Sequence, residues 1–291
     1  MSNVDLPSPE TEASPRGVRH TGRLRVDGAE VHYEVSGQGP AIVFAHGLGG
    51  NHMSWWQQVG HFRHTHTCVT FAHRGFSPLW TEGGHPDPTK YAQDLAALVD
   101  HLKLDEVHLV GQSMGGWTVV EYCLLHPQRV RSLVLSATVG SIDLERLASL
   151  DPGVLATWLK ETEKTVAQCR ATRVHPAAGL RMAREQPAKH LLYQHIDECA
   201  SGLDKEVLRG RLRAMRVRSP ADLAATGIPL LVVSPDEDIV IPPPALRALA
   251  REIAGAHITE LANTGHSPYF EKPSVFNQCL GEFFQSVERA R

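Results

Sequence analysis

The chain has 291 residues and lacks any long hydrophobic run. Its longest apolar stretches, 41–45 and 229–233, have the length of strands, whereas a membrane span needs roughly 18–20 apolar residues. The Pro- and Ser-rich stretch 1–20 has no apolar segment of the kind that a secretory signal requires, and it is predicted to be a disordered tail. We therefore expect a cytoplasmic protein with no membrane partner.

Cysteine pairs and an excess of one charge are also lacking. The five cysteines are odd in number and scattered, and no two form a CxxC pair, so neither a zinc site nor a disulfide framework is expected. The formal net charge is −3, which gives no reason to expect nucleic acid as a partner. The expected partner is a small-molecule substrate, with no cofactor and no metal, and a homodimer is left open.

What the chain does contain is an alternation of short apolar runs with segments of helical periodicity. Runs of strand length occur at 41–45, 67–72, 107–110, 131–137, 229–233 and 257–261. Apolar residues recur at helical spacing near 91–102, 114–126, 244–253 and 275–287. This alternation predicts an α/β fold with a mostly parallel sheet covered by helices on both faces.

Two segments depart from the alternation. Around Asp27-Gly28 the chain alternates apolar and polar residues, which predicts an antiparallel hairpin. Between about 140 and 226 little sequence is typical of strands, and a helical lid insertion is expected there. The predicted division is a tail at 1–20, a core domain formed by 21–139 and 227–291, and the lid (cap) domain at 140–226.

The clearest chemical motif is Gly111-Gln112-Ser113-Met114-Gly115, which lies between a predicted strand and a predicted helix. A G-x-S-x-G sequence in that context is typical of a nucleophile elbow, where a tight turn exposes the serine hydroxyl above the sheet. The first N–H groups of the following helix have no partner inside it, and they favour a negative charge near the serine. Ser113 is therefore the candidate nucleophile.

A serine hydroxyl needs a base within hydrogen-bond reach. Among 17 histidines, His266 stands out, because it follows the last predicted strand in a loop of small residues. A carboxylate between Ser113 and His266 in the chain would complete the set. Asp236, Glu237 and Asp238 crowd the loop after strand 229–233, and composition alone does not choose among them.

These motifs, with His46-Gly47-Leu48-Gly49-Gly50 before them, resemble the α/β-hydrolase superfamily, specifically its esterase, lactonase and C–C hydrolase-like branch. The resemblance covers roughly 23–287. It implies that the backbone N–H groups of Leu48 and Met114 form the oxyanion hole. It also implies that Asp238 is the acid, because relatives commonly have a proline four residues after that acid, where this chain has Pro242.

Asp236 is the reserve acid in this register, and Asp143 is a more distant one because some relatives move the acid there. The chain departs from many relatives at two positions. Ala72 replaces the aspartate that usually leads the motif retained as Arg74-Gly75, and Gln112 precedes the nucleophile where histidine is frequent. The first departure puts the close subfamily in doubt, but not the catalytic machinery.

Other residues near these motifs have two interpretations. Trp117 follows the elbow, and Trp55 and Trp56 follow the glycine-rich loop. They are candidate pocket-wall residues, although a packed core aromatic is the plainer interpretation of Trp117. The arginine-rich run 209–218 is either a solvated helix face or a clamp for an acidic substrate.

The sequence thus predicts a serine hydrolase that cleaves a small to medium carboxylic ester or lactone through an acyl-enzyme. The fold and the Ser-His-Asp set also allow C–C bond hydrolysis, a lyase reaction or cofactor-free oxygenation. A ligand receptor with a slow triad is the third class. Haloalkane dehalogenases and epoxide hydrolases are disfavoured, because those relatives have aspartate where this chain has Ser113.

Overall fold

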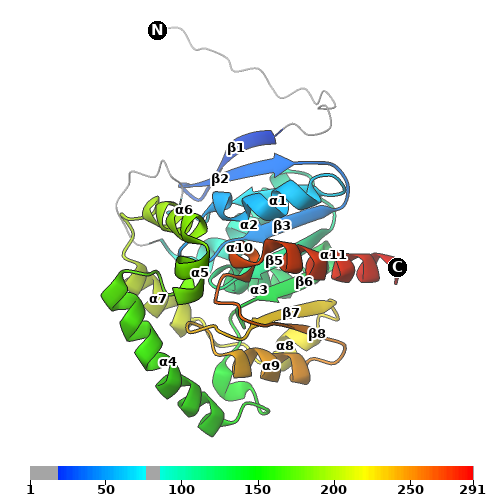
Figure 1. The fold of residues 1–291 in the computed structure, drawn as a ribbon. Helices are drawn as coiled ribbons and strands as arrows, with labels where there is room; N and C mark the ends of the chain where they lie inside the picture. Colours follow the sequence, from blue (N-terminus) through cyan, green and yellow to red (C-terminus); the bar gives the residue numbers. More distant parts are fainter. Residues whose placement is uncertain (1–18, 77–85, 291) are drawn as a thin grey trace.

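The computed structural model describes residues 19–76 and 86–290. The tail expected at 1–20 lies outside the described residues, except that Arg19 and His20 already belong to the first strand, β1. Within the described ranges the chain forms one eight-stranded sheet with helices on both sides (Figure 1). The predicted α/β fold is confirmed.

The sheet has the strand order β1-β2-β4-β3-β5-β6-β7-β8. The strands of the described chain are β1 (Arg19–Val26), β2 (Ala29–Ser36), β3 (Ala41–Ala45), β4 (Thr67–Phe71), β5 (Val107–Gln112), β6 (Val130–Ser136), β7 (Leu230–Pro235) and β8 (His257–Leu261). β1, β2 and β4 pair antiparallel, and the remaining pairs are parallel. The β1–β2 turn has positive φ at Asp27 (47°) and Gly28 (77°), as the two-residue hairpin signal predicts.

Two apolar cores lie on opposite faces of the sheet. Successive residues of a strand point to opposite faces, so Val43 joins one core while Ile42 and Phe44 join the other. The first core is covered by α2 (Tyr91–His101), α3 (Gly115–Leu125) and α9 (Pro243–Glu252). The second is covered by α1 (Trp56–Phe62) and α11 (Pro273–Arg289). Burial on both faces explains why the central strands are continuous apolar runs.

The segment between β6 and β7 is helical. It contains η4 (Leu144–Arg146), α4 (Pro152–Thr172), α5 (Gly179–Glu185), α6 (Pro187–Glu198), α7 (Lys205–Ala214) and α8 (Pro220–Ala224). Its two ends meet in a single β-bridge between Ile142 and Arg218. We refer to residues 140–226 as the insertion. α4 to α7 lie along one side of the molecule, next to the ends of the sheet strands (Figure 1).

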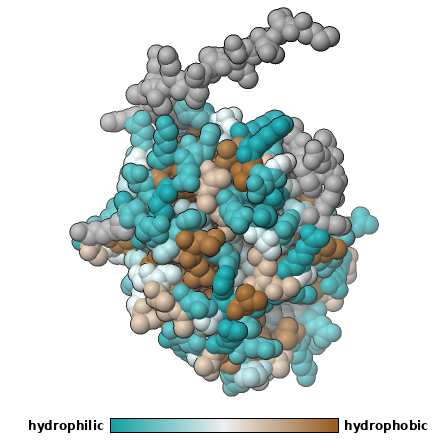
Figure 2. Space-filling model, turned by 180° about the vertical axis from the view of Figure 1, so that it is seen from behind, coloured by the Kyte–Doolittle hydropathy of each residue, from teal (hydrophilic) through white to brown (hydrophobic). Residues whose placement is uncertain are grey.

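Short elements complete the described chain. They are η1 (His52–Trp55), η2 (Pro88–Lys90), η3 (Pro127–Arg129) and α10 (Pro268–Glu271). No helix among the described residues has the length and apolarity of a membrane span. The face opposite that of Figure 1 is mostly hydrophilic, with separate apolar patches between polar residues (Figure 2).

Candidate active site

Ser113 lies in a tight turn between β5, which ends at Gln112, and α3, which begins at Gly115. Its φ is +49°, a left-handed conformation that few non-glycine residues adopt and that is enriched at functional sites. The turn needs small neighbours. A Cβ at Gly115 would overlap the Ala45 carbonyl, and one at Gly111 would lie 2.5 Å from Val119 Cγ2. Ser113 is half-buried, while both of its neighbours are buried.

His266 and Asp238 form a buried hydrogen-bonded pair. His266 Nδ1 lies 2.8 Å from Asp238 Oδ2, and the residues are 2% and 1% exposed. The second carboxylate oxygen, Oδ1, accepts the backbone N–H groups of Val240 at 2.7 Å and Ile241 at 2.9 Å. A carboxylate held this way fixes the imidazole orientation and leaves Nε2 free to face a nucleophile.

The two reserve acids are engaged elsewhere. Asp236 is exposed, and its Oδ1 accepts the Thr264 backbone N–H at 3.1 Å. Asp143 caps η4 by accepting the Glu145 N–H at 3.0 Å. Of the three candidate acids, Asp238 is the one that the structure brings to His266.

Gln112 connects the serine turn to the histidine loop. Its Nε2 donates to the His266 carbonyl at 3.0 Å, so the residue before Ser113 holds the residue that carries the imidazole. The same side chain closely approaches the glycine-rich loop. A Cβ at Gly47 would overlap Gln112 Oε1 and lie 3.1 Å from Ser113 Cβ. The three motifs far apart in the sequence therefore meet around Gln112 and Ser113.

A buried histidine pair supports the glycine-rich loop. His46 Nε2 accepts the His73 backbone N–H at 3.0 Å, and His46 Nδ1 lies 2.8 Å from the Gly47 carbonyl. His73 Nε2 in turn contacts the Thr118 hydroxyl at 2.8 Å. Burial lowers the pKa of His46 to about 3 and that of His73 well below its ordinary value. Both imidazoles are thus neutral near pH 7 and serve as hydrogen-bond links.

Glu271 supports the histidine loop from the other side. Its Oε2 accepts the Gly265 backbone N–H at 2.7 Å, and burial raises the pKa of this carboxyl. Sequence reasoning did not single out Gln112, His73 or Glu271 as supports of the site. Gln112 and His73 are joined to partners far away in the sequence, whereas Glu271 lies six residues after Gly265. Only the proximity of Gln112 and Glu271 to the motifs could have drawn attention to them.

Leu48 and Met114, the expected oxyanion donors, share one small apolar cluster. Met114 is buried in it with Phe76 and Trp117, and Leu48 packs against it. Met114 is the N-cap of α3, where the first backbone N–H groups have no partner within the helix. The cluster therefore brings the side chains of Leu48 and Met114 into one apolar group.

The three candidate wall residues lie in different environments. Trp117 is 5% exposed and its indole donates to the Leu212 carbonyl of α7 at 2.8 Å, so it joins the core to the insertion. Trp55 is fully buried, with ring centroids 4.3 Å from Tyr269. Trp56 is 49% exposed and lines a cavity of about 530 Å³. Neither Ser113 nor His266 lines that cavity.

The arginine-rich run of the insertion is engaged in several contacts. Arg218 Nε donates to Glu121 Oε1 at 2.9 Å, and Arg209 pairs with Glu206. Arg216 lies over the Trp117 ring, 5.1 Å from its centroid. These contacts favour a structural role for those three side chains.

The described residues also contain a group of three possible metal ligands, away from the serine turn in the sequence: His32, Glu34 and His52.

Comparison with known proteins agrees with this geometry. A protein named "Putative non-heme bromoperoxidase BpoC" from Mycobacterium tuberculosis is 29% identical over 88% of this chain and 98% of its own length. The 3-oxoadipate enol-lactonase 2 of Acinetobacter baylyi is 24% identical over 88% of this chain and 94% of its own. The solved structure of Est816, described as an N-acyl homoserine lactone degrading enzyme, superposes with a TM-score of 0.71 at 26% identity, covering 90% of this chain and all of that one.

A family model supplies the decisive match. The model for the alpha/beta hydrolase fold covers residues 40–273, which is most of the chain and includes the glycine-rich loop, the serine turn, the acid loop and the histidine loop. The solved structures that match in fold include esterases, an enol-lactonase and a bromoperoxidase. The chain therefore belongs to the α/β-hydrolase family of enzymes.

Proposed function

We propose that this enzyme is a serine hydrolase that cleaves a small to medium carboxylic ester or lactone through an acyl-enzyme. The observation that carries the proposal is the buried His266–Asp238 hydrogen bond of 2.8 Å, tied to the serine turn by the Gln112 side chain. A serine in a tight elbow, together with a histidine that a carboxylate orients, supplies the parts needed for nucleophilic acyl transfer.

In the proposed reaction His266 takes the Ser113 proton as the hydroxyl oxygen attacks the acyl carbon. Asp238 holds the imidazole in the required tautomer and stabilises its charged form. The N–H groups of Leu48 and Met114 receive the negative charge that develops on the carbonyl oxygen, and one such donor typically lowers the barrier by about 3 kcal/mol. Water activated by His266 then releases the acyl group.

The named activities of the relatives support an acyl substrate. One relative is named an enol-lactonase, and one solved structure is described as an N-acyl homoserine lactone degrading enzyme. A peroxide-dependent halogenation is a second candidate, because another relative is named a bromoperoxidase. Bromination of phenol red with bromide and hydrogen peroxide would test the second candidate on the same preparation.

The test is turnover of a panel of p-nitrophenyl esters and simple lactones by wild type and Ser113→Ala. We expect Ser113→Ala to lower kcat on the order of a thousandfold or more, with the fold intact, because the hydroxyl supplies chemistry and little packing. Ser201→Ala, at an exposed serine of the insertion, is the control and should match wild type. Substantial ester turnover by folded Ser113→Ala would overturn the proposed nucleophile.

A further inference from the structure

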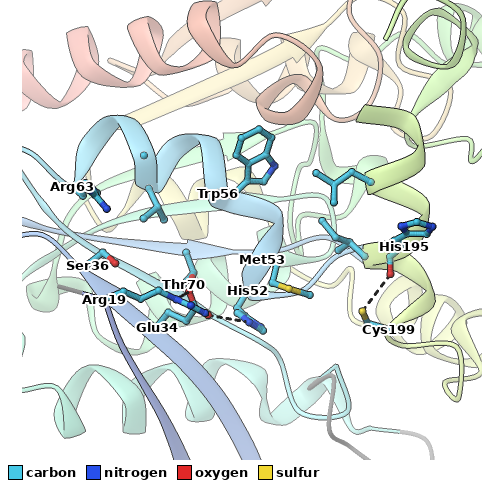
Figure 3. A pocket seen from close by; sticks show the side chains of 14 residues that line it. Arg19, Glu34, Ser36, His52, Met53, Trp56, Arg63, Thr70, His195 and Cys199 are labelled. Atoms are coloured by element: carbon cyan, nitrogen blue, oxygen red, sulfur yellow. Dashed lines mark hydrogen bonds and ion pairs between the residues drawn. The ribbon is translucent and has the colours of Figure 1, made fainter. Parts of the chain in front are cut away.

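The cavity of about 530 Å³ lies outside the candidate active site, between β2, the η1–α1 segment and α6 (Figure 3). One part of its wall is apolar and includes Met53, Trp56 and Leu192. Another part is charged and includes Glu34 and His52. The hydrolase mechanism uses none of these side chains.

Beside the charged wall, three potential metal ligands converge. His32 and Glu34 are two residues apart on β2, so they project from the same face of the sheet. His52 begins η1. One ligand atom from each of the three lies within 4.8 Å of the others. His52 Nε2 is 3.3 Å from Glu34 Oε1, and the His32 and His52 ring centroids are 4.4 Å apart.

The burial of His52 makes this cluster more than a surface group of charges. His52 is only 5% exposed, and its Nδ1 has no hydrogen-bond partner within the described part of the chain. Leaving a buried polar atom unpaired typically costs about 1–3 kcal/mol. The His52 imidazole therefore has one buried ring nitrogen, Nδ1, without a partner among the described residues, while its Nε2 faces Glu34.

The donor set selects the class of ion. Two imidazole nitrogens and one carboxylate oxygen suit Zn²⁺ and related transition metals, whereas Ca²⁺ and Mg²⁺ prefer oxygen ligands. We propose that His32, Glu34 and His52 form a binding site for a divalent transition-metal ion of the Zn²⁺ class. Three protein ligands leave a fourth position for water or a small ligand, and the neighbouring cavity offers room for one.

Arg19 competes with the ion for Glu34. Its Nε donates to Glu34 Oε2 at 2.8 Å, and its terminal nitrogen contacts Oε1 (Figure 3). A metal bound to the same carboxylate has to weaken this ion pair, so Arg19 lowers the affinity of the site for the ion.

The site also has a structural consequence. His52 lies two residues beyond Gly50, so a bound ion would link β2 to the segment that continues from the glycine-rich loop.

Titration of the tag-free protein with Zn²⁺ by calorimetry tests the proposal, and the visible absorption of bound Co²⁺ reports the ligand set. We expect one tight equivalent in wild type. Glu34→Gln should weaken it at least about tenfold, because even supporting contacts of a metal ligand are worth 10–100-fold. Arg19→Ala should tighten it severalfold by removing the competitor. Mg²⁺ should not displace the Co²⁺.

Two variants control for adventitious binding. Glu30→Gln removes a carboxylate of the same strand that is paired with Arg23 at 3.6 Å, and His64→Asn removes an exposed histidine. Both should bind like wild type. The proposal is overturned if no tight equivalent exists, if Glu34→Gln binds like wild type, or if Arg19→Ala weakens binding. Glu34 and Arg19 have side chains 17% and 61% exposed, so these two variants decide the question even if His52→Asn does not fold.

Discussion

The sheet core and the insertion are held in different ways. In the core, every residue of β3 and β5 is buried. In the insertion, α4 has 21 residues, of which Cys169 alone is buried. Other parts of the insertion pack into the core, because Met182, Tyr193 and Ile196 belong to the second apolar core. Polar contacts add to this packing, such as Trp158 Nε1 to the Asp238 carbonyl at 3.1 Å and the Arg181–Glu237 ion pair. The exposed helix α4 is therefore the part of the insertion whose changes should disturb the core least.

We propose that the core provides the catalytic side chains and that the insertion determines substrate selectivity. The proposed catalytic side chains stand at strand ends and are fixed by backbone and buried side-chain contacts. The insertion covers that edge with exposed helices, and we propose that it acts as a lid that shapes the substrate pocket. Substitutions in the core should then change kcat, and substitutions at the contact between the two regions should change kcat and KM together.

The largest expected effect is in the core, at the acid. Asp238→Asn should lower kcat by about ten thousandfold, because an amide stabilises the wrong tautomer of His266. Asp236→Asn is the matched control. It keeps an amide oxygen that can still accept the Thr264 N–H, so it should change both stability and kcat little. Steady-state kinetics on both folded variants make the comparison. An inactive Asp236→Asn beside an active Asp238→Asn would require the acid to be reassigned.

Acid pH should also lower the stability of the protein, through two buried histidines of the core. His46 and His73 have folded-state pKa values below the unfolded value of about 6.5. The unfolded chain then binds more protons as pH falls below about 6.5, and stability is lost. With a folded pKa of about 3, His46 alone should cost on the order of 2 kcal/mol at pH 5.

Urea unfolding at pH 7.5, 6 and 5 measures this loss. His73→Gln removes one titrating group and should flatten the acid dependence, although the variant starts from lower stability. His64→Asn, at an exposed histidine, should keep the wild-type slope. A free energy of unfolding that stays constant from pH 7.5 to 5 would contradict the account of these buried histidines.

A smaller effect is expected where the two regions touch. A Cβ at Gly49 would lie 2.9 Å from Tyr193 Oη, 3.1 Å from Asp197 Oδ1 and 3.3 Å from His175 Cε1, all in the insertion. Gly49→Ala should therefore displace the loop next to Leu48 and lower kcat/KM by about tenfold, because catalysis tolerates little misplacement.

Gly60→Ala is the matched control for this substitution. No atom lies within 4 Å of its added Cβ, and Gly60 is inside α1, so the change should stabilise the protein by about 0.5–1 kcal/mol without altering turnover. Wild-type kinetics for Gly49→Ala would contradict the tight contact between the insertion and the glycine-rich loop.

The same contrast explains what the sequence could predict. Strand positions followed from continuous apolar runs, and the serine turn followed from small residues between a strand and a helix. These signals are local, because tight turns and buried strands restrict nearby residue types. The sequence pattern alone left three acids in one loop as possible partners of His266. The family resemblance was needed to choose Asp238. The role of Gln112 depends on the His266 carbonyl, 154 residues away in the sequence, which only the folded chain brings near.

The most direct test of the central claim is covalent labelling of the intact protein with phenylmethylsulfonyl fluoride. An activated serine reacts with this reagent, whereas ordinary serine hydroxyls are nearly inert. The account predicts a single adduct by intact mass, located on Ser113 by peptide mapping, with loss of ester turnover in proportion to labelling. An active enzyme that remains unlabelled, or that is labelled at another residue, would contradict the proposal that Ser113 is the nucleophile.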